Sequence, residues 1–357
     1  MSGAVKVGAG MRAGLGKVTA ALILVLALCG ACTRGVMAVE TAPQLLTEAT
    51  IADAMIADDG ARIALNAWLP DGPPRAVVIA VHGMNDYGRA FEQPAAGWTR
   101  VGLAVYAPDL RGFGRSLERG RWYGGPRMAG DLLTLARLLR DRHPGTPVHL
   151  LGESMGGAVA VLAAARAEPG LFASLVLSAP AVWGEGWRMG LTYGAAQAMG
   201  RVVPGVTVGR RSYDNPSTDD PATLKRLRED PLILHRTRFD TLAGIIRLMR
   251  TARQEAGRVR LPTLLMLGDL DGHVPRDGVA ALARRLPADT RLALYPKGRH
   301  LLLRSLGGDA VAADVAAWLD DRARPLPSGA DARARACAWL ILQPERGCRM
   351  GYNVGMP

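Results

Sequence analysis

The sequence has little lysine, few aromatic residues and no long run of basic residues. Only four of its 44 basic residues are lysine, and 5% of its 357 residues are aromatic. The arginines are scattered among alanine and glycine, without the interleaved aromatic residues of a single-strand binding surface. The formal net charge of +12 therefore does not predict a nucleic-acid partner, although a basic surface favours anionic membranes.

Cysteine is also scarce, which excludes a disulfide-rich small protein. The four cysteines are irregularly spaced. The single Cys-x-x-Cys spacing, from Cys29 to Cys32, lies in an apolar leader without a zinc-type histidine cluster, so no metal site is predicted. Cys337 and Cys348 leave two alternatives open, a disulfide in an oxidising compartment or two free thiols.

No apolar run is long enough for a comfortable membrane span. Val18–Leu28 is an uncharged, mostly apolar stretch of eleven residues, and Lys6, Arg12 and Lys17 precede it. This layout predicts a secretory signal over residues 1–31.

The end of this leader resembles the cleavage box of bacterial lipoproteins. Leu28-Cys29-Gly30-Ala31 precedes Cys32, which is the residue that would carry the lipid. Cys29 departs from the box, because leucine usually stands there. We expect an exported protein of the cell envelope, lipid-anchored in a bacterial membrane. The alternatives are a soluble periplasmic or secreted form and an uncleaved anchor.

Residues 44–320 alternate between strand-like apolar runs and segments with apolar residues at helical spacing. With 49% apolar residues overall, the chain can bury a sizeable core. Runs that are apolar throughout indicate strands covered on both faces, so the alternation predicts an α/β fold with a mainly parallel sheet flanked by helices. The predicted strands are 62–69, 76–81, 103–107, 148–151, 175–177, 263–267 and 292–295, and the predicted helices are 128–140, 155–165, 279–286 and 310–319.

Residues 181–260 interrupt this alternation. A stretch of about 80 residues is too long for a plain loop, and its helical patterns predict a helical cap inserted after the sixth strand. Beyond the domain, residues 321–357 form a tail of uncertain structure, in which 321–336 are expected to be a solvated linker. The first part of the cap carries apolar side chains that either pack internally or accept an acyl chain; they are Trp183, Trp187, Met189, Leu191, Tyr193 and Met199.

The segment Gly152-Glu153-Ser154-Met155-Gly156 fits the pattern Gly-x-Ser-x-Gly. It follows a predicted strand and precedes a predicted helix, which is the context that an exposed nucleophilic serine requires. Small residues on both sides of Ser154 allow the turn to be sharp, and the helix N-terminus favours developing negative charge. Ser154 is therefore the candidate nucleophile.

A serine nucleophile needs a base and a group that orients the base. His300 follows the predicted strand 292–295, at the same edge of the sheet as Ser154, and is the candidate base. Asp269 and Asp271 both follow the strand 263–267, and spacing alone excludes neither. Along the chain the candidates follow in the order Ser154, Asp271, His300. This is the order of nucleophile, acid and base that this class of fold uses. His273 is expected to be a loop residue.

The loop after the first long buried strand carries His82-Gly83-Met84. The glycine lets a backbone N–H turn toward the active site. The N–H groups of Met84 and Met155 are therefore the candidate pair that stabilises an oxyanion. His82 is expected to fix the loop rather than to act as a base.

These motifs, with Asp109-Leu110-Arg111-Gly112-Phe113-Gly114-Arg115-Ser116, resemble the α/β-hydrolase superfamily. Residues 60–320 are similar to the monoacylglycerol lipase and lysophospholipase group, also called serine aminopeptidase-like hydrolases. Within it, the resemblance aligns Asp271 with the acid of the triad. The segment Arg228-Glu229-Asp230-Pro231-Leu232 is also similar, whereas the leader and the residues beyond 321 depart from the group.

The resemblance implies a serine esterase that cleaves an apolar acyl ester, such as a monoacylglycerol or lysophospholipid, without a metal or organic cofactor. The implied partners are a lipid or small-ester substrate and a membrane surface, and the oligomeric state stays open. One alternative keeps the triad for amide hydrolysis, as an amidase or aminopeptidase, or for acyl transfer. A second is a non-catalytic lipid-binding protein of the cell envelope, because fold alone does not fix function.

Overall fold

The structure, a computed structural model, describes residues 42–336 apart from 49–50, 117, 183–186 and 210–215. The predicted signal at 1–31, Cys32 and the pair Cys337 and Cys348 lie outside the described residues. Within the described part, no helix is both long and apolar enough to cross a membrane.

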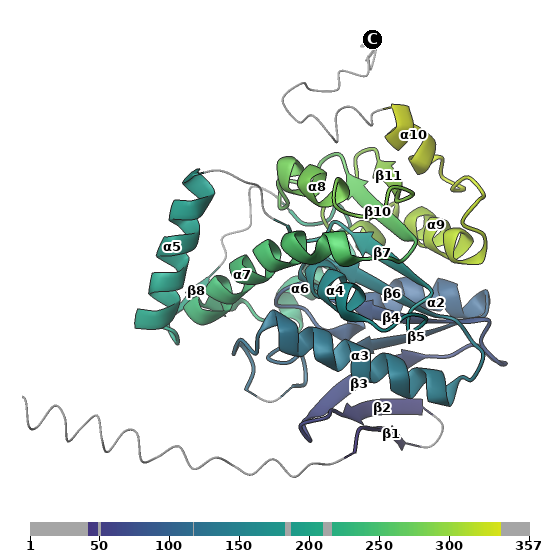
Figure 1. Cartoon of the computed structure of the whole chain (residues 1–357), viewed down its shortest axis with the longest axis horizontal. Helices are drawn as coiled ribbons and strands as arrows, with labels where there is room; N and C mark the ends of the chain where they lie inside the picture. The colour runs from purple at the N-terminus through teal and green to yellow at the C-terminus, as the bar shows by residue number, and fades with distance from the viewer. Residues whose placement is uncertain (1–41, 49–50, 117, 183–186, 210–215, 337–357) are drawn as a thin grey trace, which may run out of the picture. The chain divides into compact units, whose positions relative to one another are not determined.

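A nine-stranded sheet forms the centre of the fold (Figure 1), in the order β1-β2-β3-β5-β4-β6-β7-β10-β11. In this sheet β5, β4, β6, β7, β10 and β11 pair in parallel. The strands β1, β2 and β3 pair antiparallel along one edge, and β3 is antiparallel to β5. The mainly parallel sheet is thereby confirmed. The strands are β1 (Gln44–Glu48), β2 (Ile51–Ile56), β3 (Arg62–Trp68), β4 (Ala76–Val81), β5 (Leu103–Pro108), β6 (Val148–Glu153), β7 (Ser174–Ser178), β10 (Thr263–Gly268) and β11 (Arg291–Tyr295).

Helices cover both faces of the sheet and bury two separate apolar clusters. One cluster includes Leu132 of α3, Val159 of α4 and Leu282 of α8, and the other includes Trp98 of α2 and Trp318 of α9. Every residue of β4, β5, β6 and β7 is buried, which explains why these central strands are mostly apolar. The helices are α2 (Glu92–Arg100), α3 (Gly125–Arg142), α4 (Met155–Arg166), α8 (Arg276–Ala283) and α9 (Gly308–Asp320).

The predicted insertion at 181–260, hereafter the inserted segment, lies between β7 and β10. It follows the seventh strand rather than the sixth. The sheet begins with β1 and β2, a hairpin whose short strands lack the continuous apolar run of the central strands and were not predicted. The inserted segment contains α5 (Trp187–Val202), β8 (Thr207–Gly209), α6 (Pro221–Glu229), β9 (Arg236–Arg238) and α7 (Phe239–Glu255).

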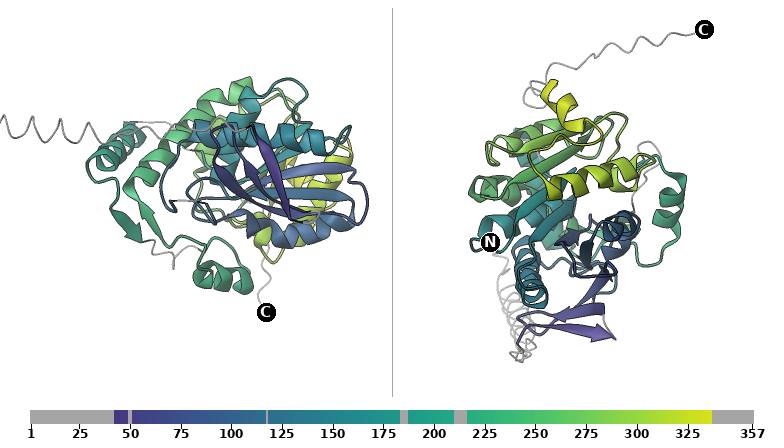
Figure 2. Two further views of the ribbon diagram at one scale, coloured as in Figure 1. Left: turned by 90° about the horizontal axis from the view of Figure 1, so that it is seen from below. Right: turned by 90° about the vertical axis from the view of Figure 1, so that its right-hand side faces the viewer.

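Within the inserted segment, α7 packs against α4 and buries Ile245 and Leu248 in the first apolar cluster. Helix α5 packs on α7, and β8 pairs with β9 (Figure 2). Trp183 lies outside the described residues, and the side chains of Trp187, Met189 and Leu191 are not described. The segment is therefore anchored through α7, while α5 lies one layer farther from the sheet.

The prediction of a solvated linker at 321–336 was wrong. Helix α10 (Ala330–Ala336) packs against β11, and Leu326 and Ala330 are buried in the second apolar cluster. The buried carboxylate of Asp331 accepts a hydrogen bond from the Leu326 N–H and pairs with Arg291. Ala330 and Ala334, four residues apart, form a narrow buried apolar stripe on this helix. The surrounding arginines concealed this stripe in the sequence.

Candidate active site

Ser154 lies on a sharp turn between β6 and α4. Its backbone has φ 54° and ψ −119°, which a non-glycine residue adopts only under strain. Glycines on both sides allow the close approach. A Cβ atom on Gly152 would lie 2.4 Å from the Gly156 carbonyl oxygen, and one on Gly156 would lie 2.1 Å from the Val81 carbonyl oxygen. A larger residue at position 152 would force this turn apart, and one at position 156 would push α4 away from the end of β4.

His300 lies in the loop after β11 and faces Ser154. Its Nε2 atom is 2.8 Å from Ser154 Oγ, and its Nδ1 atom is 2.9 Å from Asp271 Oδ2. Because an ionised carboxylate only accepts hydrogen bonds, the ring carries its proton on Nδ1 and presents the Nε2 lone pair to the serine hydroxyl. The side chains predicted from three distant motifs therefore meet in one hydrogen-bonded chain.

Asp271, rather than Asp269, contacts His300. The second oxygen of Asp271 accepts hydrogen bonds from the backbone N–H groups of His273, at 2.8 Å, and Val274, at 3.3 Å. Burial alone would raise the pKa of Asp271, but the hydrogen bond from His300 and these two N–H groups hold it below its usual value. Asp271 therefore remains ionised at the near-neutral pH at which a hydrolase of this kind needs a neutral imidazole as its base. Asp269 Oδ1 is buried without a hydrogen-bond partner among the described residues.

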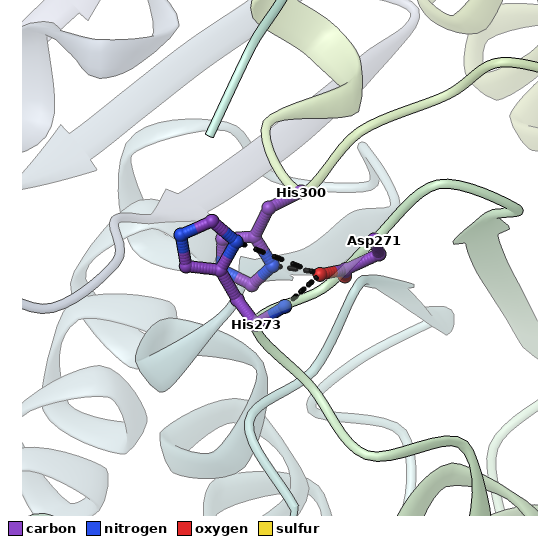
Figure 3. Close-up of side chains that lie close together, drawn as sticks. All are labelled: Asp271, His273 and His300. Carbon is purple, nitrogen blue, oxygen red and sulfur yellow. Dashed lines mark hydrogen bonds and ion pairs between the residues drawn. The ribbon is translucent and has the colours of Figure 1, made fainter. Parts of the chain in front are cut away.

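The predicted loop residue His273 stacks on His300 (Figure 3). The two ring centroids are 4.9 Å apart and the rings are inclined by 25°. Asp271, His273 and His300 are the group of described side chains that could offer three ligand atoms to a metal ion, within 4.8 Å of one another. In the arrangement observed, however, His300 Nδ1 and Asp271 Oδ2 already share a hydrogen bond.

The loop after β4 lies against the nucleophile. A Cβ atom on Gly83 would lie 3.3 Å from Ser154 Cβ, so this backbone passes directly beside the serine. Met84 is the next residue, and Met155 begins α4 immediately after Ser154. The two candidate oxyanion N–H groups therefore belong to two chain segments that meet beside Ser154, the loop after β4 and the start of α4.

His82 fixes this loop, as predicted. Its Nε2 atom accepts a hydrogen bond from the Leu110 N–H at 2.9 Å, so its proton is on Nδ1, 2.8 Å from the Gly83 carbonyl oxygen. Burial lowers the pKa of His82, which keeps the ring neutral. The ring is fully buried and makes both of its hydrogen bonds with backbone groups.

Three hydrogen bonds tie the loop after β4 to the inserted segment. Tyr87 donates to Asp230 at 2.7 Å, and the Asn85 side-chain amide donates to Thr237 at 2.8 Å. The Leu234 N–H donates to the Asn85 carbonyl oxygen at 2.9 Å. Residues next to the candidate oxyanion site are thereby fastened to the part of the chain expected to bind substrate.

Sequence reasoning missed a buried ion group behind the nucleophile. Arg304, only 1% exposed, pairs with Asp86 and Glu153. The one signal in the sequence is the position of Glu153 directly before Ser154, where a charged side chain on a buried strand requires a partner.

A family model described as "Serine aminopeptidase, S33" matches residues 72–306, which is more than half of the chain and spans the whole site. The chain belongs to the serine aminopeptidase S33 family. The match ends before α9 and α10, so neither helix carries the family assignment.

Curated relatives of this S33 member include two lipases. A monoacylglycerol lipase of Mycolicibacterium smegmatis is 31% identical over 270 residues, covering 73% of this chain and 93% of that protein. A monoglyceride lipase of Rattus norvegicus is 29% identical, covering 74% of this chain and 88% of that one. Among solved structures, a Paleococcus ferrophilus monoacylglycerol lipase superposes with a TM-score of 0.63 at 23% identity, covering 72% and 98%. This last likeness establishes the α/β-hydrolase fold.

Proposed function

We propose that the protein is a serine hydrolase that cleaves carboxylic esters with an apolar acyl group through an acyl-enzyme on Ser154. The observation that carries this proposal is the hydrogen-bonded chain from Ser154 through His300 to Asp271. Relatives that are named monoacylglycerol lipase and monoglyceride lipase support the ester as substrate.

In the first half of the reaction, Ser154 Oγ attacks the ester carbonyl carbon while its proton passes to His300 Nε2. Asp271 stabilises the imidazolium that forms and keeps the ring oriented. The carbonyl oxygen becomes an oxyanion that accepts hydrogen bonds from the Met84 and Met155 N–H groups. The intermediate collapses, and His300 donates the proton to the departing alcohol.

In the second half, water takes the place of the alcohol. His300 Nε2 accepts a proton from the water as it attacks the acyl-Ser154 carbonyl. The second oxyanion uses the same two N–H groups, and its collapse releases the carboxylic acid and returns the proton to Ser154. Every proton transfer is assigned to a group of this chain.

The family description also names aminopeptidases, so amide hydrolysis is the competing reaction. An N-terminal peptide requires an ionised carboxylate for its ammonium group. Both reactions would use the same triad, and the relatives named monoacylglycerol lipase and monoglyceride lipase favour the ester. The test is a panel of p-nitrophenyl esters of increasing chain length, a monoacylglycerol, a lysophospholipid and an aminoacyl amide. Faster cleavage of the amide than of every ester would overturn the proposal.

We also propose export through the leader and anchoring through a lipid on Cys32. The basic residues, apolar run and small residues before Cys32 support this proposal. Cys32→Ser is expected to abolish incorporation of radiolabelled palmitate and to release the protein from the membrane fraction, because each buried CH₂ of an acyl chain contributes about 0.8 kcal/mol to anchoring. Cys29→Ser is the matched control and should keep the label. Equal labelling of wild type and Cys32→Ser would contradict the assignment.

Exposed apolar side chains near the end of α5 support contact with a lipid surface. Val202 is 77% exposed and Val206 50% exposed, and Met199 and Val208 are also exposed. A cluster of such residues on a substrate-binding segment suits transfer of a lipid from a bilayer.

Val202→Asp is expected to lower the rate on monoacylglycerol in anionic vesicles by roughly five- to tenfold, because it puts a charge where the apolar surface meets lipid. The rate on soluble p-nitrophenyl butyrate should stay within twofold of wild type. Val101→Asp is the control, since Val101 is 47% exposed but precedes β5, at the edge of the sheet opposite Ser154. Equal losses in both variants would refute a role for the α5 surface.

A further inference from the structure

Arg304 is the most unusual charged residue outside the hydrogen-bonded chain of Ser154, His300 and Asp271. It lies four residues after His300, at the end of a short 3-10 helix (Leu302–Arg304). Its side chain is 2% exposed, and its two terminal nitrogens donate to two different carboxylates. One bonds to Asp86 Oδ2 at 2.6 Å and the other to Glu153 Oε1 at 2.5 Å.

The two carboxylates belong to the two segments that carry the candidate oxyanion donors. Asp86 lies in the loop after β4, where its own N–H donates to the Gly83 carbonyl oxygen and closes a turn around Met84. Glu153 is the last residue of β6 and immediately precedes Ser154. One guanidinium therefore connects the Met84 loop to the nucleophile turn.

Stability alone is a poor reason for this group. It places one positive and two negative charges in the interior, and Arg304 Nε and Glu153 Oε2 lack a partner among the described residues. Burial alone would raise the pKa of Asp86, but the charge of Arg304 and hydrogen bonds from Arg304 and the Tyr87 N–H hold it below its usual value. Well-packed apolar side chains of similar volume often replace buried ion pairs without loss of stability.

We propose that Arg304 is a positioning residue that holds the Met84 N–H at the distance from Ser154 that oxyanion stabilisation requires. The inference rests on the proposed ester hydrolysis. An arginine suits this role because its planar fork fixes two carboxylates in one geometry, whereas a lysine offers a single point charge. Oxyanion donors must lie about 2.7–3.1 Å from the developing charge, so a small shift of the loop is costly.

The test compares Arg304→Lys and Asp86→Asn with wild type at a temperature well below unfolding. Loss of a whole oxyanion donor lowers kcat by about 10²–10³-fold, so a displaced donor should lower it by roughly 10- to 100-fold with KM within about twofold. Inhibition by a trifluoromethyl ketone, whose adduct with Ser154 carries an oxyanion, should weaken in parallel. Glu153→Gln keeps the shape and tests the second arm if Arg304→Lys does not fold.

Asp131→Asn is the matched control for a structural effect. It breaks the buried pair of Asp131 in α3 with Arg111, which are 4% and 8% exposed and 2.7 Å apart. This control should lower the unfolding temperature and leave kcat unchanged. Losses of kcat at Arg304 and Asp86 no larger than in the control, or losses confined to KM, would overturn the positioning role.

The two proposals fail in distinguishable ways. Absence of ester turnover in the wild type refutes the proposed function. The rate of covalent labelling of Ser154 by a fluorophosphonate does not require a known substrate and still reports the oxyanion site. Labelling of Arg304→Lys and Asp86→Asn at the wild-type rate refutes the positioning role on its own.

Discussion

Ser154→Ala is expected to lower kcat for ester hydrolysis by about 10⁴- to 10⁶-fold, as for other triad nucleophiles. The substitution removes the atom that attacks the carbonyl carbon and keeps the Cβ that the strained turn already accommodates. The fold should persist, because the hydroxyl makes its one side-chain hydrogen bond to His300. Initial rates with a p-nitrophenyl ester, and thermal unfolding followed by circular dichroism, measure both effects.

Ser178→Ala is the control for this variant. Ser178 is buried on the adjacent strand β7, and its hydroxyl has no hydrogen-bond partner among the described residues. The control should retain turnover close to that of the wild type. Near wild-type turnover in Ser154→Ala itself would exclude the acyl-enzyme mechanism.

Asp271→Asn is expected to lower kcat by at least about 10²-fold, since an amide allows the wrong imidazole tautomer and no longer stabilises the imidazolium. The position of the proton is decisive here. Asp271 Oδ2 lies 2.9 Å from His300 Nδ1 and fixes the proton there, which leaves Nε2 free to accept the proton of Ser154. Kinetics of the purified variant across the pH range measure the loss.

Asp269→Asn is the matched control, because Asp269 lies in the same loop and makes no hydrogen bond to His300. Its turnover should stay within about tenfold of wild type, as expected for a side chain that does not touch the reacting groups. A larger loss at Asp269 than at Asp271 would reverse the assignment of the acid.

The central sheet and the three meeting side chains were predictable because their signals are local. Parallel strands buried on both faces, such as β4 and β5, stand out in the sequence as continuous, largely apolar runs. The turn at Ser154 leaves a glycine pattern because its backbone geometry excludes other residues. Asp271 and His300 lie in the loops after β10 and β11, so the topology brings them to one edge of the sheet, and the family resemblance was needed to choose Asp271 over Asp269.

Arg304, by contrast, gives no local signal. It is one arginine among many, and its partners Asp86 and Glu153 are 218 and 151 residues away in the sequence. The β1–β2 hairpin and α10 were missed for a related reason. Their burial depends on packing against β3 and β11; β1 and β2 are short, and the composition of α10 resembles that of an exposed segment.

The hydrogen bonds from Tyr87 and Asn85 to the inserted segment have a consequence for enzyme engineering. Exchanging this segment for one from a relative is an obvious route to a different acyl-chain preference. Such an exchange also replaces Asp230 and Thr237, which hold the loop beside the oxyanion site. Chimeras that retain these two residues should keep their turnover while their selectivity changes, whereas chimeras without them should lose turnover on every ester. We therefore expect an exchange that discards Asp230 and Thr237 to lower turnover whatever its effect on selectivity, because the loop after β4 loses its two side-chain contacts.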